Sequence, residues 1–65
     1  MTDTDKEDRF LREPEVAQIT GLSRTTRWRL EREGRFPRRR RASPNRVAWL
    51  LSEVQSWIRE REVVA

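Results

Sequence analysis

The chain has 65 residues, of which 40% are charged, and a formal net charge of +4 without any cysteine or histidine. A chain of this length has room for one small domain of about three helices, near the lower size limit at which a core sustains a fold. Disulfides and thiolate metal sites are excluded, and a zinc ion would find only carboxylate ligands, so we expect no metal and no cofactor.

The composition also bears on the compartment. The sequence has no run of about 18 apolar residues that could span a membrane. Its first residues are acidic and polar, unlike the basic start and apolar stretch of a signal peptide. We therefore expect a cytoplasmic protein that has no contact with a membrane. Its expected setting is a bacterial or phage-infected cell.

Residues 1–9 contain no apolar side chain after Met1 and are mostly charged. Such a segment buries too little surface to offset the entropy lost on ordering. We predict a disordered acidic tail here. Alternatively, this tail shields a basic surface or contacts another protein.

The first structured element is expected at the two apolar residues 10 and 11, just before a helix. Pro14 is suited to the first turn of this helix, and Gly21 is suited to the left-handed position that follows its end. Val16 and Ile19 lie three residues apart, so they should share the face that packs on the core.

A second helix is predicted directly afterwards. Ser23 is a good N-cap residue, residues 24–33 contain neither glycine nor proline, and Gly34 ends the element. Two short helices joined at Gly21 match a helix-turn-helix, in which the second helix enters the DNA major groove. We expect Trp28 and Leu30 to face the core. The polar residues expected to point outward are Arg24, Thr25, Arg27 and Arg29.

A β-hairpin is predicted next, because residues 38–42 and 46–50 flank the turn residues Ser43-Pro44-Asn45. Val47 and Trp49 share one face by the twofold period of a strand, and we assign that face to the core. About two of the four arginines at 38–41 should face solvent on the opposite side.

The last helix is expected to open with Ser52-Glu53-Val54-Gln55, which fits a capping box in which the serine caps the helix. Trp57 and Ile58 continue the apolar helical spacing, so this helix should close the core, as should Trp49. Residues 63–65 are expected to be frayed.

Charge is segregated along the chain. Residues 24–46 contain ten arginines against Glu31 and Glu33, a net charge of +8, whereas the remaining residues carry five basic and nine acidic side chains, or −4. A mixed, solvated surface does not predict this segregation. The central block is therefore interpreted as a surface that binds a polyanion.

Three blocks carry a resemblance to a known family. They are Leu22-Ser23-Arg24-Thr25-Thr26, then Gly34-Arg35-Phe36-Pro37, and finally the segment from Trp49 to Trp57. In this order and spacing they resemble the AlpA family of prophage regulators, which is similar to small phage excisionases and to MerR-like winged helix-turn-helix domains. The resemblance covers about residues 10–62. It implies a mainly α fold with a small β-hairpin, in the order α-α-β-β-α.

The resemblance also implies a DNA-binding surface, with residues 23–33 as the recognition helix and residues 38–46 as the wing. Arg27 stands where the family commonly has an aliphatic residue, so either its stem packs while its guanidinium reaches solvent, or the helix is rotated. Trp28 stands where a tyrosine is usual, and either packs in the core or contacts DNA. The candidate DNA-binding residues are Ser23, Arg24, Thr25, Thr26, Arg27, Trp28, Arg29, Arg38, Arg39, Arg40, Arg41 and Arg46.

The function that these patterns predict is sequence-specific binding of double-stranded DNA, in transcription regulation or recombination directionality, at the nucleoid. We expect cooperative self-association on DNA and a phage integrase as a candidate partner. An arginine-rich RNA-binding module and a recombinase-interacting adaptor are the alternatives. A solvated helix face and a solubilising arginine tract are simpler explanations of the same residues. We expect no enzyme, because no nucleophile and base can be named in the sequence.

Overall fold

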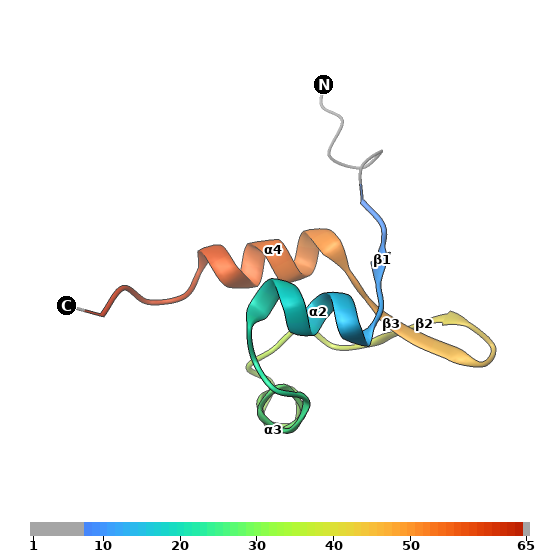
Figure 1. The fold of residues 1–65 in the computed structure, drawn as a ribbon, viewed down its shortest axis with the longest axis horizontal. Coiled ribbons are helices and arrows are strands. Elements are labelled where there is room, and N and C mark those ends of the chain that lie inside the picture. Colours follow the sequence, from blue (N-terminus) through green and yellow to red (C-terminus); the bar gives the residue numbers. More distant parts are fainter. Residues whose placement is uncertain (1–7, 65) are drawn as a thin grey trace.

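Turn and cap residues divide residues 8–64, the part of the chain that the computed structural model describes, into three helices and three strands (Figure 1). Their order differs from the expected α-α-β-β-α, because a short strand precedes the first helix. The elements are β1 (Phe10–Leu11), α2 (Glu13–Thr20), α3 (Arg24–Arg32), β2 (Arg40–Ser43), β3 (Arg46–Leu50) and α4 (Leu51–Arg59). None of the helices within residues 8–64 is long and apolar enough to cross a membrane.

The caps of α2 and α3 follow the sequence signals. Gly21 adopts the left-handed conformation with φ of 72°, and its N–H donates to Ala17 O at 2.8 Å. Ser23 Oγ then accepts a hydrogen bond from the N–H of Thr26 at 3.1 Å, so α3 begins where predicted. Gly34 follows the end of α3, again with a positive φ of 74°. The predicted pair of short helices joined at Gly21 is confirmed.

The three strands form one antiparallel sheet in the order β1-β3-β2. The hairpin β2-β3 was predicted, and Arg40 pairs with Ala48 in its register. β1 was not predicted as a strand. It pairs Phe10 with Leu50 and Leu11 with Trp49, and a two-residue strand is too short to show an alternating pattern in sequence.

The core lies where α2 and α4 meet the sheet. Its buried members are Leu11, Val16, Phe36, Trp49 and Val54, with Leu30, Leu51, Trp57 and Ile58 packed partly buried around them. The prediction that Trp49 is a core residue is confirmed, since only 4% of it is exposed. Trp57 packs edge-on against Phe36 and donates its indole N–H to Arg35 O at 2.7 Å.

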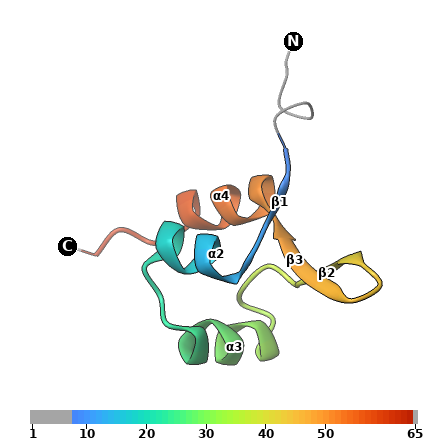
Figure 2. The same ribbon diagram turned by 45° about the vertical axis from the view of Figure 1, so that its right-hand side comes forward.

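Three apolar residues assigned to the core are instead largely exposed. Val47 is 45% exposed, Ile19 41% and Trp28 50%. Val47 shares a strand face with Trp49 as expected, but it lies two residues nearer the turn of the hairpin. The tip of the hairpin extends away from the helices (Figure 2). Trp28 was assigned inward because it is apolar, whereas α3 turns its neighbour Arg27 to the core.

The start of α4 is capped from a distant part of the chain. Leu50 is the N-cap, and Ser52 does not cap the helix with its own side chain, so the predicted capping box is wrong. Asp8 instead accepts hydrogen bonds from Ser52 N at 3.0 Å and Ser52 Oγ at 2.8 Å. These hydrogen bonds, first the backbone one, lower the pKa of the Asp8 carboxyl.

The boundary of the predicted acidic tail therefore changes. Asp8 and Arg9 belong to the fold, because Arg9 O also accepts from Leu51 N at 2.8 Å. Residues 1–7 and Ala65 lie outside the described part of the chain. After α4, Val63 and Val64 belong to no helix or strand and are 92% and 87% exposed.

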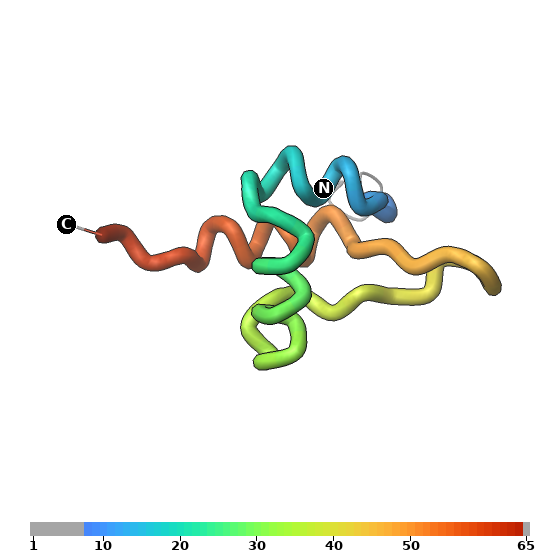
Figure 3. Tube along the Cα trace, turned by 60° about the horizontal axis from the view of Figure 1, so that its bottom comes forward, coloured from blue at the N-terminus to red at the C-terminus, as the bar shows by residue number. Residues whose placement is uncertain are grey.

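Seen with the lower side brought forward, the hairpin and α4 extend in opposite directions from the core, and α3 lies in front of them (Figure 3). The basic block identified in the sequence, residues 24–46, runs from α3 through β2 to the start of β3.

Candidate nucleic-acid interface

A groove of about 630 Å³ separates α3 from the hairpin. We call it the α3–hairpin groove, and its lining residues are Glu13, Arg24, Thr25, Arg27, Trp28, Glu31, Arg39, Val47 and Trp49. A second hollow of about 340 Å³ adjoins it and is lined by Trp28, Glu31, Arg32, Arg38 and Arg39. Trp28 lines both hollows, so its indole stands between them.

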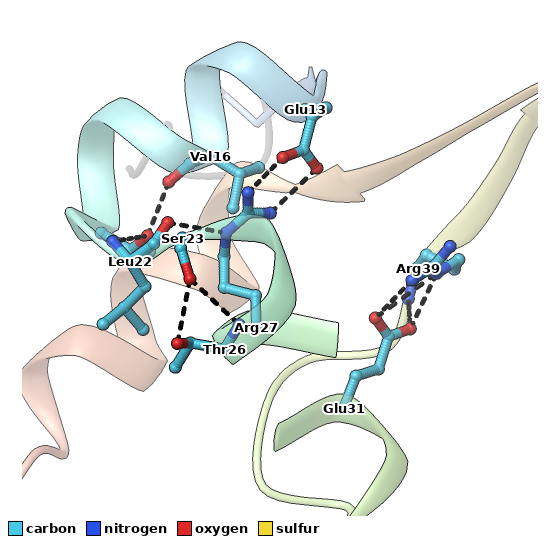
Figure 4. Close-up of polar contacts among 9 residues, drawn as sticks. Glu13, Val16, Leu22, Ser23, Thr26, Arg27, Glu31 and Arg39 are labelled. Carbon is cyan, nitrogen blue, oxygen red and sulfur yellow. Dashed lines mark hydrogen bonds and ion pairs between the residues drawn. The ribbon is translucent and has the colours of Figure 1, made fainter. Parts of the chain in front are cut away.

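Arg27 is an internal anchor of this surface. Only 2% of the residue is exposed. Its guanidinium donates to both carboxylate oxygens of Glu13, with Nη1 at 3.0 Å from Oε1, and its Nε donates to Leu22 O at 3.2 Å (Figure 4). The expectation that the guanidinium reaches solvent is wrong, because Glu13 supplies the counter-charge that makes its burial tolerable. Arg27 is therefore not accessible to DNA.

Glu13 is the partner that sequence reasoning missed. The hydrogen bond from Arg27 holds the pKa of the Glu13 carboxyl below its usual value, although burial opposes this shift. The pair joins the first turn of α2 to the middle of α3 and fixes how the two helices cross. Fourteen residues separate the partners, so no local pattern could have revealed the contact.

Arg39 links the hairpin segment to α3 through Glu31. The Glu31 carboxylate accepts from the Arg39 backbone N–H at 3.0 Å, from Nε at 3.1 Å and from Nη2 at 3.1 Å (Figure 4). Burial raises the pKa of Glu31, but the hydrogen bonds from Arg39 outweigh burial and leave the pKa lowered. The Arg39 guanidinium also lies 5.6 Å from the ring centroid of Trp49.

Arg40 makes the corresponding link to α4. Its Nη2 donates to Glu53 Oε2 at 2.7 Å, and its Nε donates to Glu53 Oε1 at 3.3 Å. We refer to Arg27, Arg39 and Arg40 as the paired arginines. All three were among the predicted site residues, and each links two parts of the fold.

Six other arginines of the basic block are exposed and form no ion pair with a carboxylate within residues 8–64. Arg41 donates to Pro44 O at 3.0 Å and thereby braces the hairpin turn. We call this set the unpaired arginines: Arg24, Arg29, Arg32, Arg38, Arg41 and Arg46. Arg32 was not among the predicted site residues.

The remaining predicted site residues lie on α3. The hydroxyls of Ser23 and Thr26 bond to each other at 3.0 Å as part of the cap, whereas Thr25 is exposed and lines the groove. Trp28 is half exposed, with the guanidinium of Arg32 at 4.7 Å from its ring centroid. By the 3.6-residue period, positions 24, 25, 28 and 32 share the outward face of α3, and position 29 lies at its flank.

Comparison with known proteins identifies the family. Residues 9–62 match the family model described as Prophage CP4-57 regulatory protein (AlpA). The chain belongs to the AlpA family. It is also 47% identical over 55 residues to the uncharacterized protein ORF88 of Enterobacteria phage P4, a match that covers 85% of this chain and 62% of that relative. The chain thus spans less than two thirds of the length of ORF88.

Membership confirms the resemblance seen in the sequence. The description of the matching family model is that of a prophage regulatory protein. The three helices and the small antiparallel sheet are consistent with a DNA-binding domain of that kind.

Proposed function

We propose that this AlpA-family protein binds double-stranded DNA sequence-specifically as a winged helix-turn-helix. In this arrangement α3, within residues 23–33, enters the major groove, and the wing, residues 38–46, lies on the minor groove or the flanking phosphates. The observation that carries the proposal is the set of exposed, unpaired arginines on α3 and the hairpin segment, of which Arg24 lines the α3–hairpin groove and Arg32 and Arg38 line the adjoining hollow. Arginine suits both ligands, because its planar guanidinium binds phosphate and guanine in a bidentate manner.

The residues divide into readers and supports. Arg24, at the start of α3, is the proposed base-reading arginine, and Thr25 contacts a phosphate or a base edge. Arg29 and Arg32 hold the backbone beside α3. On the wing, Arg38, Arg41 and Arg46 contact phosphates or the narrow minor groove, whose negative potential favours arginine.

The supports include several residues of the original candidate set. Arg27, Arg39 and Arg40 are bound to carboxylates, so we assign them to holding α3 and the wing at the spacing that DNA requires. Ser23 and Thr26 serve the cap of α3. This division reduces the number of arginines that neutralise phosphates to fewer than the sequence alone suggests.

The biological output is proposed from the family. A phage regulatory protein acts at a promoter or at a recombination site, in transcription or in the direction of excision, on DNA of the bacterial nucleoid. One domain this small covers a short DNA site, so cooperative binding to repeated sites would supply the missing specificity. A phage integrase is the proposed partner at a recombination site.

The test is a footprint on DNA around the gene, followed by anisotropy titrations of the protected duplex. Arg24→Ala should relax preference at one position, at a cost of about 1–3 kcal/mol, whereas Arg41→Ala should weaken all sequences alike. The logarithm of affinity should fall with log salt at a slope of about −0.9 per neutralised phosphate. Stronger competition by structured RNA than by duplex DNA would contradict the proposal.

A further inference from the structure

Two exposed apolar side chains line the α3–hairpin groove. Trp28 of α3 is 50% exposed and Val47 of β3 is 45% exposed, and both line the α3–hairpin groove. The other large exposed apolar residues of the described chain, Phe10, Ile19, Val63 and Val64, do not line it. Apolar surface gathered in one concave site is typical of a binding function.

The charge of the groove limits what it can bind. Its lining includes Arg24, Arg27 and Arg39, but also the carboxylates of Glu13 and Glu31. Arg27 is bound to Glu13 and Arg39 to Glu31, which leaves only Arg24 without a counter-charge. Because these ion pairs neutralise both carboxylates and two of the guanidinium groups, Arg24 is the one lining residue with charge left to offer a phosphate, and the other free surface of the groove is largely apolar. The groove therefore suits an uncharged part of the nucleic acid.

The surroundings of Trp28 further limit which uncharged part of the nucleic acid can bind in the groove. The guanidinium of Arg32 covers part of the indole at 4.7 Å from the ring centroid. This contact restrains the side chain, while half of the residue remains exposed and lines the groove. An apolar group of DNA can pack against this exposed surface. In the major groove of DNA, the apolar group presented by the bases is the C5-methyl of thymine.

We propose that Trp28 is a specificity-determining residue that packs against a thymine methyl group, with Val47 forming the opposite wall of its site. Trp28 lies one helical turn after Arg24 on the outward face of α3, so this thymine would lie a base pair or two from the base that Arg24 reads. The inference rests on the proposed function, since it requires α3 in the major groove. It adds a preference for DNA that contains thymine over the same site with uracil or cytosine.

Substitution of deoxyuridine for thymidine tests the proposal, because it removes one methyl group and changes nothing else. Each thymidine of the footprinted duplex is replaced in turn, and affinity is measured by anisotropy for the unmodified protein. At one or two positions the affinity should fall about fourfold, the effect of exposing one methyl group. Equal affinity for thymidine and deoxyuridine at every position would overturn the proposal.

Variants then assign the contact. Trp28→Ala should bind the thymidine and deoxyuridine duplexes equally at those positions, and Val47→Ala should reduce the difference in part. Ile19→Ala is the matched control, because Ile19 is an exposed apolar residue of α2 outside the groove. It should keep the full fourfold difference. Thermal unfolding of each variant verifies the fold.

The outcomes separate this inference from the proposed function. If the unmodified protein shows no preference for any duplex, the proposed function itself fails. If it binds one duplex selectively and Trp28→Ala keeps the deoxyuridine effect, only the assignment to Trp28 fails.

Discussion

Nine arginines of the basic block, residues 24–46, fall into two groups that composition cannot tell apart. The paired arginines, Arg27, Arg39 and Arg40, are each bound to a carboxylate on another element. The unpaired arginines belong to the same block and make no such ion pair among residues 8–64. Some arginines of the basic block, whose net charge is +8, therefore hold the fold together and do not offer their charge to DNA. The number of arginines is therefore an upper bound on the number of DNA contacts.

The largest effect is expected from breaking the buried pair. Glu13→Ala leaves the Arg27 guanidinium buried without a counter-charge, and should lower the free energy of unfolding by about 2–3 kcal/mol. This estimate lies below the full cost of a buried charge because the Glu13 side chain is 38% exposed. Denaturant titration measures the loss.

Two further variants sharpen this result. Glu33→Ala is the matched control, since the Glu33–Arg35 pair is exposed on both sides and should change stability by less than about 1 kcal/mol. Combining Glu13→Gln with Arg27→Leu removes both charges and should recover most of the stability. A loss for the double variant as large as that of Glu13→Ala would contradict the account.

The next largest effect distinguishes the unpaired Arg38 from its neighbour, the paired Arg39. Arg38→Ala should leave the free energy of unfolding unchanged and reduce the salt slope of DNA binding by about one. Arg39→Ala should lower the free energy of unfolding by about 1 kcal/mol, because Glu31 loses its hydrogen bonds. Chemical unfolding and salt-dependent anisotropy are measured on both variants. Identical profiles would show that the division is wrong.

The acidic partners predict a pH dependence of stability. The pKa values of Glu13 and Glu31 are lowered from the usual 4.5, so their unfolded forms bind protons first as the pH falls. The stability that they contribute is present above about pH 4.5 and is lost as the pH falls through their folded pKa values. Thermal unfolding measured at steps from about pH 6 down to about pH 3 should show this loss of stability. Glu31→Gln should make it shallower, and an unchanged pH profile in that variant would argue against the role of Glu31.

The smallest effect concerns the distant cap of α4. Asp8→Asn should speed amide hydrogen exchange at Ser52, because the N–H of Ser52 loses its charged acceptor. Asp8 lies at the surface, so the melting temperature should change little. Exchange at Thr26, which is capped by Ser23, is the internal control. Equal exchange at Ser52 in the two proteins would remove Asp8 from the cap.

The parts of the fold that the sequence predicted depend on local chemistry. Gly21, Ser23 and Gly34 act within a few residues of their own position, and the turn at Pro44 does the same. Their geometry follows from backbone preferences that a short sequence window contains. The two short helices and the hairpin were accordingly predicted with nearly correct bounds.

The parts that were missed depend on contacts between distant residues. Asp8 and Ser52 are 44 residues apart, and Arg27 and Glu13 are 14 apart. From residue type alone, an arginine is expected to point outward and a tryptophan inward. On α3 the ion pair with Glu13 holds Arg27 inside, and Trp28 points outward. The candidate site was predicted as a region. The division of its arginines between scaffold and surface required the positions of three glutamates.

The salt slope of DNA binding tests the central claim most directly. It is compared for the unmodified protein, for the triple variant with Arg38, Arg41 and Arg46 changed to alanine, and for the double variant Glu13→Gln with Arg27→Leu. The account predicts that the triple variant loses about 0.9 of slope for each phosphate contact removed. Its free energy of unfolding should fall by less than about 1 kcal/mol, through loss of the exposed hydrogen bond from Arg41 to Pro44 O. The double variant should keep the full slope. An unchanged slope in the triple variant, or a reduced slope in the double variant, would contradict the account.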